Sequence, residues 1–159
     1  MHLSSVKLFI STDIYINQYL YKSSMSETKK ILFVCVENAG RSQIAEGFFR
    51  KYAKSSYQSI SAGTHPISET NPLVIEVMNE VGIDISKHIP KMISEAMIKQ
   101  STKIVNMGCM DKESCPTLFL NNVIDWNILD PKGKSIEEVR KIRDQIEAKV
   151  IELVKNLER

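Results

Sequence analysis

One short segment of the sequence combines residue types suited to oxyanion chemistry: a cysteine, five intervening residues, an arginine and a serine. These residues are Cys35, Arg41 and Ser42. An apolar run precedes the segment and an amphipathic pattern follows it, which indicates a loop between a strand end and a helix N-terminus. Backbone N–H groups and the helix dipole at such a place attract anions and favour the thiolate form of cysteine. The segment therefore predicts an anion-binding loop with a nucleophilic sulfur.

The residues of this loop have distinct expected roles. Arg41 can hold two oxygens of a tetrahedral oxyanion in a bidentate fork, and Ser42 can donate a hydrogen bond to the Cys35 sulfur. Asn38 tolerates left-handed backbone angles, whereas Glu37 is expected to face solvent because an inward carboxylate would repel the substrate. The expected substrate-binding residues are Val36, Glu37, Asn38, Ala39, Gly40 and Arg41. The alternative is a buried structural cysteine at a strand end, since the spacing alone is a weak motif.

Two further cysteines, Cys109 and Cys115, lie in a polar stretch over residues 108–116, where we expect exposed and mobile thiols. Three cysteines are an odd number, which argues against a secreted disulfide framework. A zinc half-site is the alternative, but the pair lacks a second pair of ligands and the usual spacing. The sequence therefore predicts catalytic thiols in a reducing compartment, with no metal ion and no cofactor.

Apolar spacing predicts strands that alternate with helices along the chain. The expected strands cover residues 30–36, 57–62, 103–107 and 123–126, and the expected helices cover residues 42–54, 72–81, 94–100 and 135–157. This alternation is typical of an α/β fold with a four-stranded parallel sheet flanked by helices. Ligands of such sheets bind beyond the carboxyl ends of the strands. Cys35, the stretch after Met107 and Asp130 all follow expected strands, so they can converge on one site.

Composition and charge indicate a single globular domain. The chain has 159 residues, of which 43% are hydrophobic and 25% charged, with a formal net charge of +2. That charge is too small to indicate nucleic acid or a membrane surface as a partner, and neither a signal peptide nor a membrane span is visible. We therefore expect a cytoplasmic monomer whose domain covers residues 29–159. Residues 1–28 lack periodicity and are expected to form a poorly structured extension.

The segment VCVENAGRSQIAEGFF, residues 34–49, resembles the active-site segment of the low-molecular-weight protein tyrosine phosphatase fold. Within it, residues 41–47 are similar to the arsenate reductase branch, whereas the phosphatases usually carry Arg-Ser-Pro at its start. Further matching motifs follow in order at residues 61–63, 82–86, 107–109, 115–116, 125–126 and 130–131. The resemblance covers residues 29–157 and implies a thioredoxin-coupled arsenate reductase of this fold.

The resemblance implies a sequence of thiol reactions. Cys35 attacks arsenate, Cys109 then attacks Cys35 and releases arsenite, and Cys115 moves the disulfide to Cys109–Cys115. A thioredoxin-like protein then reduces that disulfide. The order in which Cys109 and Cys115 attack is an inference from the resemblance. Asp130, which Pro131 holds out of helical geometry, becomes the general acid for the departing oxygen; judged by its residues alone, this dipeptide is usually a turn.

Two other functions stay open at this point. A phosphomonoester phosphatase needs Cys35, Arg41 and Asp130 but has no use for the two later cysteines. Lys132 and Gly133 stand where phosphatases of this fold commonly carry tyrosines, which counts against phosphotyrosine recognition. A non-catalytic thiol sensor or arsenite-binding module would need neither the arginine fork nor the general acid. The sequence favours the reductase among the three.

The resemblance also implies a potassium ion behind the anion loop of related reductases. Asn38, Glu46 and Ser61 match three of its ligands, and the fourth position falls near Lys91. Two interpretations of Lys91 stay open. Its ammonium takes the place of the ion and neutralises Glu46, or its side chain simply points to solvent.

Overall fold

The computed structural model describes residues 27–107 and 123–159, in which strands and helices alternate. The described strands are β1 (Lys29–Cys35), β2 (Tyr57–Gly63), β3 (Ser101–Asn106) and β4 (Val123–Asp125). The described helices are α2 (Arg41–Tyr52), α3 (Pro72–Asn79), α4 (Glu95–Gln100) and α5 (Ile136–Leu157). Each expected strand and helix is therefore present, with only small shifts at its ends.

The sheet is parallel throughout, with the strand order β2-β1-β3-β4. Cys35 at the end of β1 pairs with Gly63 at the end of β2, and Val34 pairs with Asn106 at the end of β3. The carboxyl ends of these strands therefore meet at one edge of the sheet, where the fold places ligands. Residues 31–34 of β1 are fully buried, as expected for a central parallel strand that is covered on both faces.

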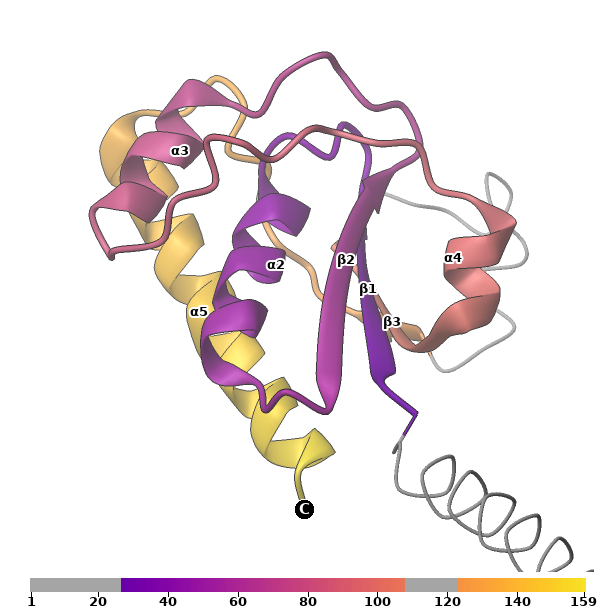
Figure 1. Cartoon of the computed structure of the whole chain (residues 1–159). Helices are drawn as coiled ribbons and strands as arrows, with labels where there is room; N and C mark the ends of the chain where they lie inside the picture. Colours follow the sequence, from indigo (N-terminus) through magenta and orange to yellow (C-terminus); the bar gives the residue numbers. More distant parts are fainter. Residues whose placement is uncertain (1–26, 108–122) are drawn as a thin grey trace, which may run out of the picture.

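The sheet lies between helices on its two faces (Figure 1). α2 and α5 pack on one face with α3 beside them, whereas α4 covers the other face. The larger core contains Phe33, whose ring centroid lies 5.8 Å from that of Phe49 and 5.9 Å from that of Trp126. The smaller core lies under α4 and consists of Leu32, Val34, Ala62, Ile98 and Ile104. Trp126, which directly follows β4, is thus a packing residue of the larger core.

Two helix starts follow from local sequence signals. The Asn71 side chain accepts a hydrogen bond from the Leu73 N–H group, and Pro72 occupies the first position of α3. Ser135 and Glu138 form both halves of a capping box at the start of α5. None of the described helices is both long enough and apolar enough to cross a membrane.

Candidate active site

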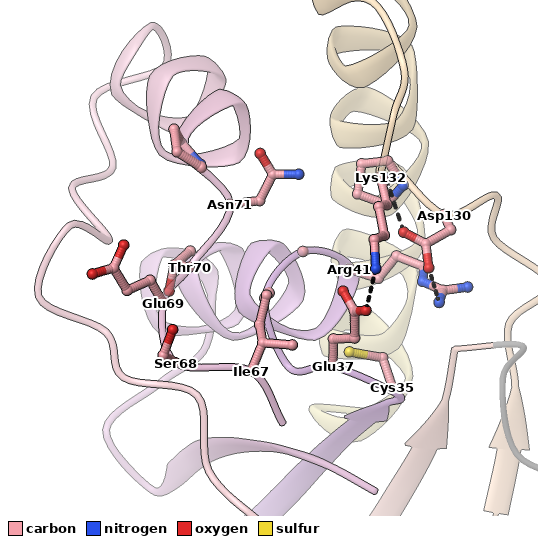
Figure 2. A pocket seen from close by; sticks show the side chains of 14 residues that line it. Cys35, Glu37, Arg41, Ile67, Ser68, Glu69, Thr70, Asn71, Asp130 and Lys132 are labelled. Atoms are coloured by element: carbon pink, nitrogen blue, oxygen red, sulfur yellow. Dashed lines mark hydrogen bonds and ion pairs between the residues drawn. The ribbon is translucent and has the colours of Figure 1, made fainter. Parts of the chain in front are cut away.

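Cys35 ends β1 at the carboxyl edge of the sheet, and residues 35–41, the anion loop, lead directly into α2. Cys35 is 3% exposed and lies at the base of a cavity of about 400 Å³. Figure 2 shows Arg41 and Asp130 on one side of this cavity and residues 67–71 on the other. The predicted position of the cysteine, between a strand end and a helix N-terminus, is confirmed.

The Cys35 sulfur has two hydrogen-bonding neighbours in the anion loop. The Asn38 N–H group donates to it at 3.2 Å, and the Ser42 hydroxyl lies 2.9 Å from it. The Asn38 amide is oriented by the Lys91 N–H group, which donates to Asn38 Oδ1 at 2.9 Å and leaves Nδ2 to donate to Ser42 Oγ at 2.8 Å. Because Ser42 Oγ accepts from Asn38, its single proton is available for the sulfur. Two donors can thus be directed at one sulfur.

The carbonyl groups of the anion loop are held on its outer side. The oxygens of Cys35, Val36, Glu37 and Ala39 accept hydrogen bonds of 2.8–3.3 Å from the backbone N–H groups of Thr64, His65, Ile67 and Asn71, respectively. We call residues 64–71 the outer segment. Because a trans peptide points its N–H and C=O groups in opposite directions, this arrangement turns the N–H groups of the loop toward the concave side. A concave row of N–H groups at a helix N-terminus suits a tetrahedral anion.

The loop depends on one close approach and on one unusual backbone angle. A Cβ atom added to Gly63 would lie 2.4 Å from the Val36 carbonyl oxygen and 2.9 Å from the Asn38 nitrogen, so only glycine fits there. Asn38 has a φ of +50°, in the left-handed region that asparagine tolerates, as the sequence predicts. Asn38 is fully buried, and its backbone and side-chain groups all hydrogen-bond.

Arg41 points toward Asp130 at the opening of the cavity. Its Nη1 donates to the carbonyl oxygens of Met107 at 3.1 Å and Ile128 at 3.0 Å. Its Nη2 donates to Asp130 Oδ2 at 2.9 Å, while the Lys132 N–H group donates to Asp130 Oδ1 at 2.9 Å. The structure thus brings the predicted arginine and the predicted acid together. The oxyanion expected to occupy the Arg41 fork has to compete with a carboxylate for Nη2.

The expectation that Glu37 simply faces solvent is wrong. Its carboxylate forms an ion pair with Lys132 Nζ at the edge of the cavity, and its side chain is only 26% exposed. Hydrogen bonding to Glu37 raises the pKa of Lys132 above its ordinary value. The pairing offsets a negative charge that would otherwise repel an incoming anion. We call Glu37, Arg41, Asp130 and Lys132 the mouth.

Behind the anion loop lies a second set of polar residues. The Glu46 carboxylate in α2 is 4% exposed; its Oε1 accepts from Arg50 and its Oε2 accepts from Ser61. Arg50 Nη1 lies 3.2 Å from His88 Nε2, and His88 Nδ1 lies 2.8 Å from Gln43 Oε1. We call Gln43, Glu46, Arg50, Ser61 and His88 the rear network.

Sequence reasoning missed three members of the rear network: Gln43, Arg50 and His88. A signal for two of them exists, because Gln43, Glu46 and Arg50 stand at positions i, i+3 and i+7 on one face of α2. A polar stripe of this kind normally faces solvent. Here Gln43 and Glu46 are buried, so the usual interpretation of the pattern is misleading. His88 has no such signal in the sequence.

Two of the predicted catalytic residues are not described by the structure. Cys109 and Cys115 lie outside the described residues. Within residues 27–107 and 123–159, no group of three or more His, Cys, Asp or Glu side chains could hold a metal ion. The described part of the site therefore supplies a buried thiol, an anion loop, an arginine and an adjacent carboxylate.

Comparison with known proteins agrees with this arrangement. The family model described as low molecular weight phosphotyrosine protein phosphatase matches residues 30–159. Arsenate reductase 2 of Staphylococcus saprophyticus is 37% identical over 133 residues, covering 82% of this chain and 99% of that protein. A thioredoxin-dependent arsenate reductase of Corynebacterium glutamicum superposes with a TM-score of 0.71 at 36% identity, covering 87% of this chain and 66% of that one. An arginine phosphatase from Geobacillus stearothermophilus superposes with a TM-score of 0.74 at 26% identity, covering 82% and 93%.

Proposed function

This chain belongs to the low molecular weight phosphotyrosine protein phosphatase family, and from that premise we propose that it reduces arsenate to arsenite with a thioredoxin-like protein as reductant. One observation carries the proposal. The Cys35 sulfur is buried in an anion loop, with the Asn38 N–H group and the Ser42 hydroxyl beside it. The likeness to arsenate reductase 2, which extends over nearly the whole of that protein, supports arsenate as the oxyanion.

In the first step, the Cys35 thiolate attacks arsenic(V), forming an S–As bond while one As–O bond breaks. The departing group is a hydroxyl of arsenate, which takes one proton from Asp130 and leaves as water. Arg41 and the N–H groups of the anion loop hold the remaining oxygens. Arg41 then pairs with the oxyanion in place of Asp130, which frees the Asp130 carboxyl group from its ion pair.

In the second step, the Cys109 thiolate attacks the Cys35 sulfur and breaks the S–As bond. The electron pair of that bond stays with arsenic, which leaves as arsenite, arsenic(III). The Cys115 thiolate then attacks Cys109 and frees Cys35, so the oxidation is stored as a Cys109–Cys115 disulfide. A dithiol of a thioredoxin-like protein reduces it. Because every step needs free thiols, we place the protein in the cytoplasm, and we expect it to act as a monomer.

The proposal is tested by arsenate-dependent NADPH oxidation in the presence of thioredoxin and thioredoxin reductase. We expect turnover for the unaltered protein, and none for Cys109→Ser or Cys115→Ser. Hydrolysis of p-nitrophenyl phosphate, measured beside it, should persist in both variants because it uses only the anion loop and Asp130. If the double variant reduces arsenate at the parental rate with this reductant, the disulfide cascade is wrong.

A phosphatase is the second candidate, favoured by the superposition with the arginine phosphatase. Both functions share Cys35, Arg41 and Asp130, so the described geometry supports either one. Efficient phosphoester hydrolysis without any arsenate-dependent NADPH oxidation would favour the phosphatase. Tight arsenite binding without turnover of either substrate would instead favour a thiol sensor.

A further inference from the structure

A buried carboxylate behind the anion loop needs a positive partner, and the resemblance to arsenate reductases implies a potassium ion there. The three matching residues do not fit such an ion. Glu46 Oε1 accepts from Arg50, Glu46 Oε2 accepts from Ser61, and Asn38 Oδ1 accepts from the Lys91 N–H group at 2.9 Å. A metal ion on Glu46 would lie beside the Arg50 guanidinium, which already holds Oε1, and two cations that close repel each other.

We propose that Arg50 is the fixed counter-cation of Glu46 and that, through His88 and Gln43, it positions the anion loop without a bound monovalent cation. A buried ionised carboxylate is costly unless it is paired and hydrogen-bonded, and Arg50 and Ser61 supply both conditions. The group that Lys91 brings to the loop is its backbone N–H. The guanidinium therefore takes the role that the sequence offered to the Lys91 ammonium.

The direction of each hydrogen bond in the rear network follows from its ends. Gln43 Nε2 donates to the Asn38 carbonyl oxygen at 2.9 Å, so Gln43 Oε1 is the atom that faces His88. His88 Nδ1 must then carry the proton, which leaves the Nε2 lone pair to accept from Arg50 Nη1 at 3.2 Å. His88 is therefore the neutral Nδ1–H tautomer, and the donor direction runs from Arg50 through His88 and Gln43 to Asn38.

The electrostatics at His88 agree with that assignment. Burial lowers the pKa of His88 below its ordinary value; the Glu46 carboxylate opposes this shift, whereas the Arg50 guanidinium adds to it. Lys91 and Asp84 act more weakly, the first lowering and the second raising the pKa. A neutral ring is what the Arg50 contact requires, because a protonated imidazole has no lone pair to offer.

The hydrogen bonds of the rear network end at Asn38, the residue that contacts the nucleophilic sulfur. Asn38 donates its N–H group to the Cys35 sulfur and its amide to Ser42, the second neighbour of that sulfur. A shift of the Asn38 backbone therefore moves both partners of the thiolate at once. Arg50 contacts none of the reacting groups, so it is a positioning residue. The role holds for any oxyanion chemistry at Cys35, and it goes beyond the proposed arsenate reduction.

Two variants of Arg50 separate the role of its charge from that of its hydrogen bond to His88. Arg50→Ala removes both, and we expect kcat/KM for p-nitrophenyl phosphate to fall roughly 10-fold to 100-fold, as for small misplacements of a catalytic group. The pH dependence of Cys35 alkylation by iodoacetamide, monitored by mass spectrometry of the Cys35 peptide, should shift to higher pH. Arg50→Lys keeps a cation for Glu46 but loses the second donor, Nη1, which contacts His88. It should therefore retain Tm better than Arg50→Ala, and its alkylation should lie between that of Arg50→Ala and that of the unaltered protein.

The chain contains a matched control for these variants. Lys99 and Glu95 on α4 have the same i, i+4 spacing as Arg50 and Glu46, but their side chains are 72% and 78% exposed. Lys99→Ala should leave Tm, kcat/KM and Cys35 alkylation unchanged. If Arg50→Ala lowers Tm but leaves kcat/KM and the alkylation profile at parental values, Arg50 is merely structural and the positioning role is overturned.

The cation half of the proposal is tested on the unaltered protein. Tm and kcat/KM for p-nitrophenyl phosphate should be the same in potassium, sodium and tetramethylammonium chloride at equal ionic strength, because no ion binds behind the loop. Stabilisation or activation by potassium over sodium would overturn the proposal. Neither readout involves arsenate, so a failure here is distinct from a failure of the proposed reduction.

Discussion

The mouth and the rear network lie on opposite sides of the same loop, and both are built from carboxylates and cations. At the mouth, the side chains of Asp130 and Lys132 are 48% and 68% exposed. In the rear network, the Glu46 carboxylate is 4% exposed, and each of its oxygens has a protein partner. In both regions one partner of the central ion pair is buried and the other exposed, because Arg41 is 7% exposed and Arg50 is 54% exposed. The two regions thus differ in which partner is buried: the arginine at the mouth and the carboxylate in the rear network.

The solvent access of the carboxylate decides what each ion pair can do. The half-exposed Asp130 carboxylate can turn to water when it leaves Arg41, so the mouth can exchange it for an oxyanion that pairs with the same arginine at little cost to the fold. A buried polar group that loses its partner costs about 1–3 kcal/mol, so the rear network keeps one arrangement. The mouth is therefore suited to chemistry, and the rear network to holding the geometry that the chemistry needs.

The largest expected effect follows from removing the Cys35 sulfur, which lies between the mouth and the rear network. Cys35→Ser should lower arsenate reduction and p-nitrophenyl phosphate hydrolysis together, by at least roughly 10³-fold, because both reactions need the same sulfur. Phosphate binding, measured by calorimetry, should persist because the loop keeps its N–H groups. Retention of either activity would show that Cys35 is not the nucleophile.

Asp130→Asn breaks the chemistry of the mouth but keeps its contact with Arg41. The amide oxygen can still accept a hydrogen bond from Arg41, whereas its NH₂ group can neither accept from the Lys132 N–H group nor act as the acid. We expect kcat to fall by about 10²–10⁴-fold. Tm should move by less than about 4 °C, because the Asp130 side chain is half exposed and the amide oxygen still pairs with Arg41. Asp144→Asn, at the exposed end of a pair with Arg143, is the control and should leave kcat unchanged. A fall in Tm without a fall in kcat would mean that Asp130 stabilises the fold and takes no part in the chemistry.

The rear network should respond to pH through His88. Its pKa is lowered in the folded protein, so its contribution to stability is fully present above the unfolded pKa of about 6.5 and is lost as the pH falls below it. Tm should therefore decrease between pH 7.5 and pH 5.5, and His88→Gln, which keeps a donor and an acceptor without titrating, should reduce that decrease. His65→Gln, an exposed histidine, should not. An unchanged pH dependence in His88→Gln would remove His88 from the rear network.

The smallest expected effect concerns charge at the mouth. Lys132→Met leaves the Glu37 carboxylate without its ion-pair partner, and KM for an oxyanion should rise by roughly 5-fold at low salt, since two charges near a surface interact by about 1–4 kcal/mol before screening. kcat should change little. The double variant Glu37→Gln with Lys132→Met should recover the parental KM. Added salt should reduce the difference in KM between Lys132→Met and the unaltered protein. If the KM of Lys132→Met changes neither with the added Glu37→Gln substitution nor with salt, the ion pair does not act through charge.

Much of the fold is predictable because its signals are local. The apolar run at residues 31–34 predicts a central parallel strand, and Ser135 with Glu138 predicts the start of α5; both signals need only a few neighbouring residues. The anion loop is equally local, since the strand end, the loop and the helix start are contiguous in the sequence. Its left-handed Asn38 follows from the residue type.

The parts that sequence could not supply depend on contacts between distant residues. Glu37 meets Lys132 across 95 positions, and Gln43 meets His88 across 45. Whether a charged residue faces solvent or a partner is decided by such contacts and leaves no periodic trace in the chain. For this reason the orientation of Glu37 was predicted wrongly, and the rear network was not predicted beyond Glu46 and Ser61.

The outer segment sets an unusual rule for which substitutions the site tolerates. It supports the anion loop through the N–H groups of Thr64, His65, Ile67 and Asn71, and every amino acid except proline offers that group. Pro66 stands between two of the donors, at a position from which no N–H group is needed. Apart from Asn71, whose side chain also caps α3, these donor positions are therefore free to vary in side chain as long as proline is avoided. Residues beside the catalytic loop can thus differ widely among relatives while the loop keeps its shape.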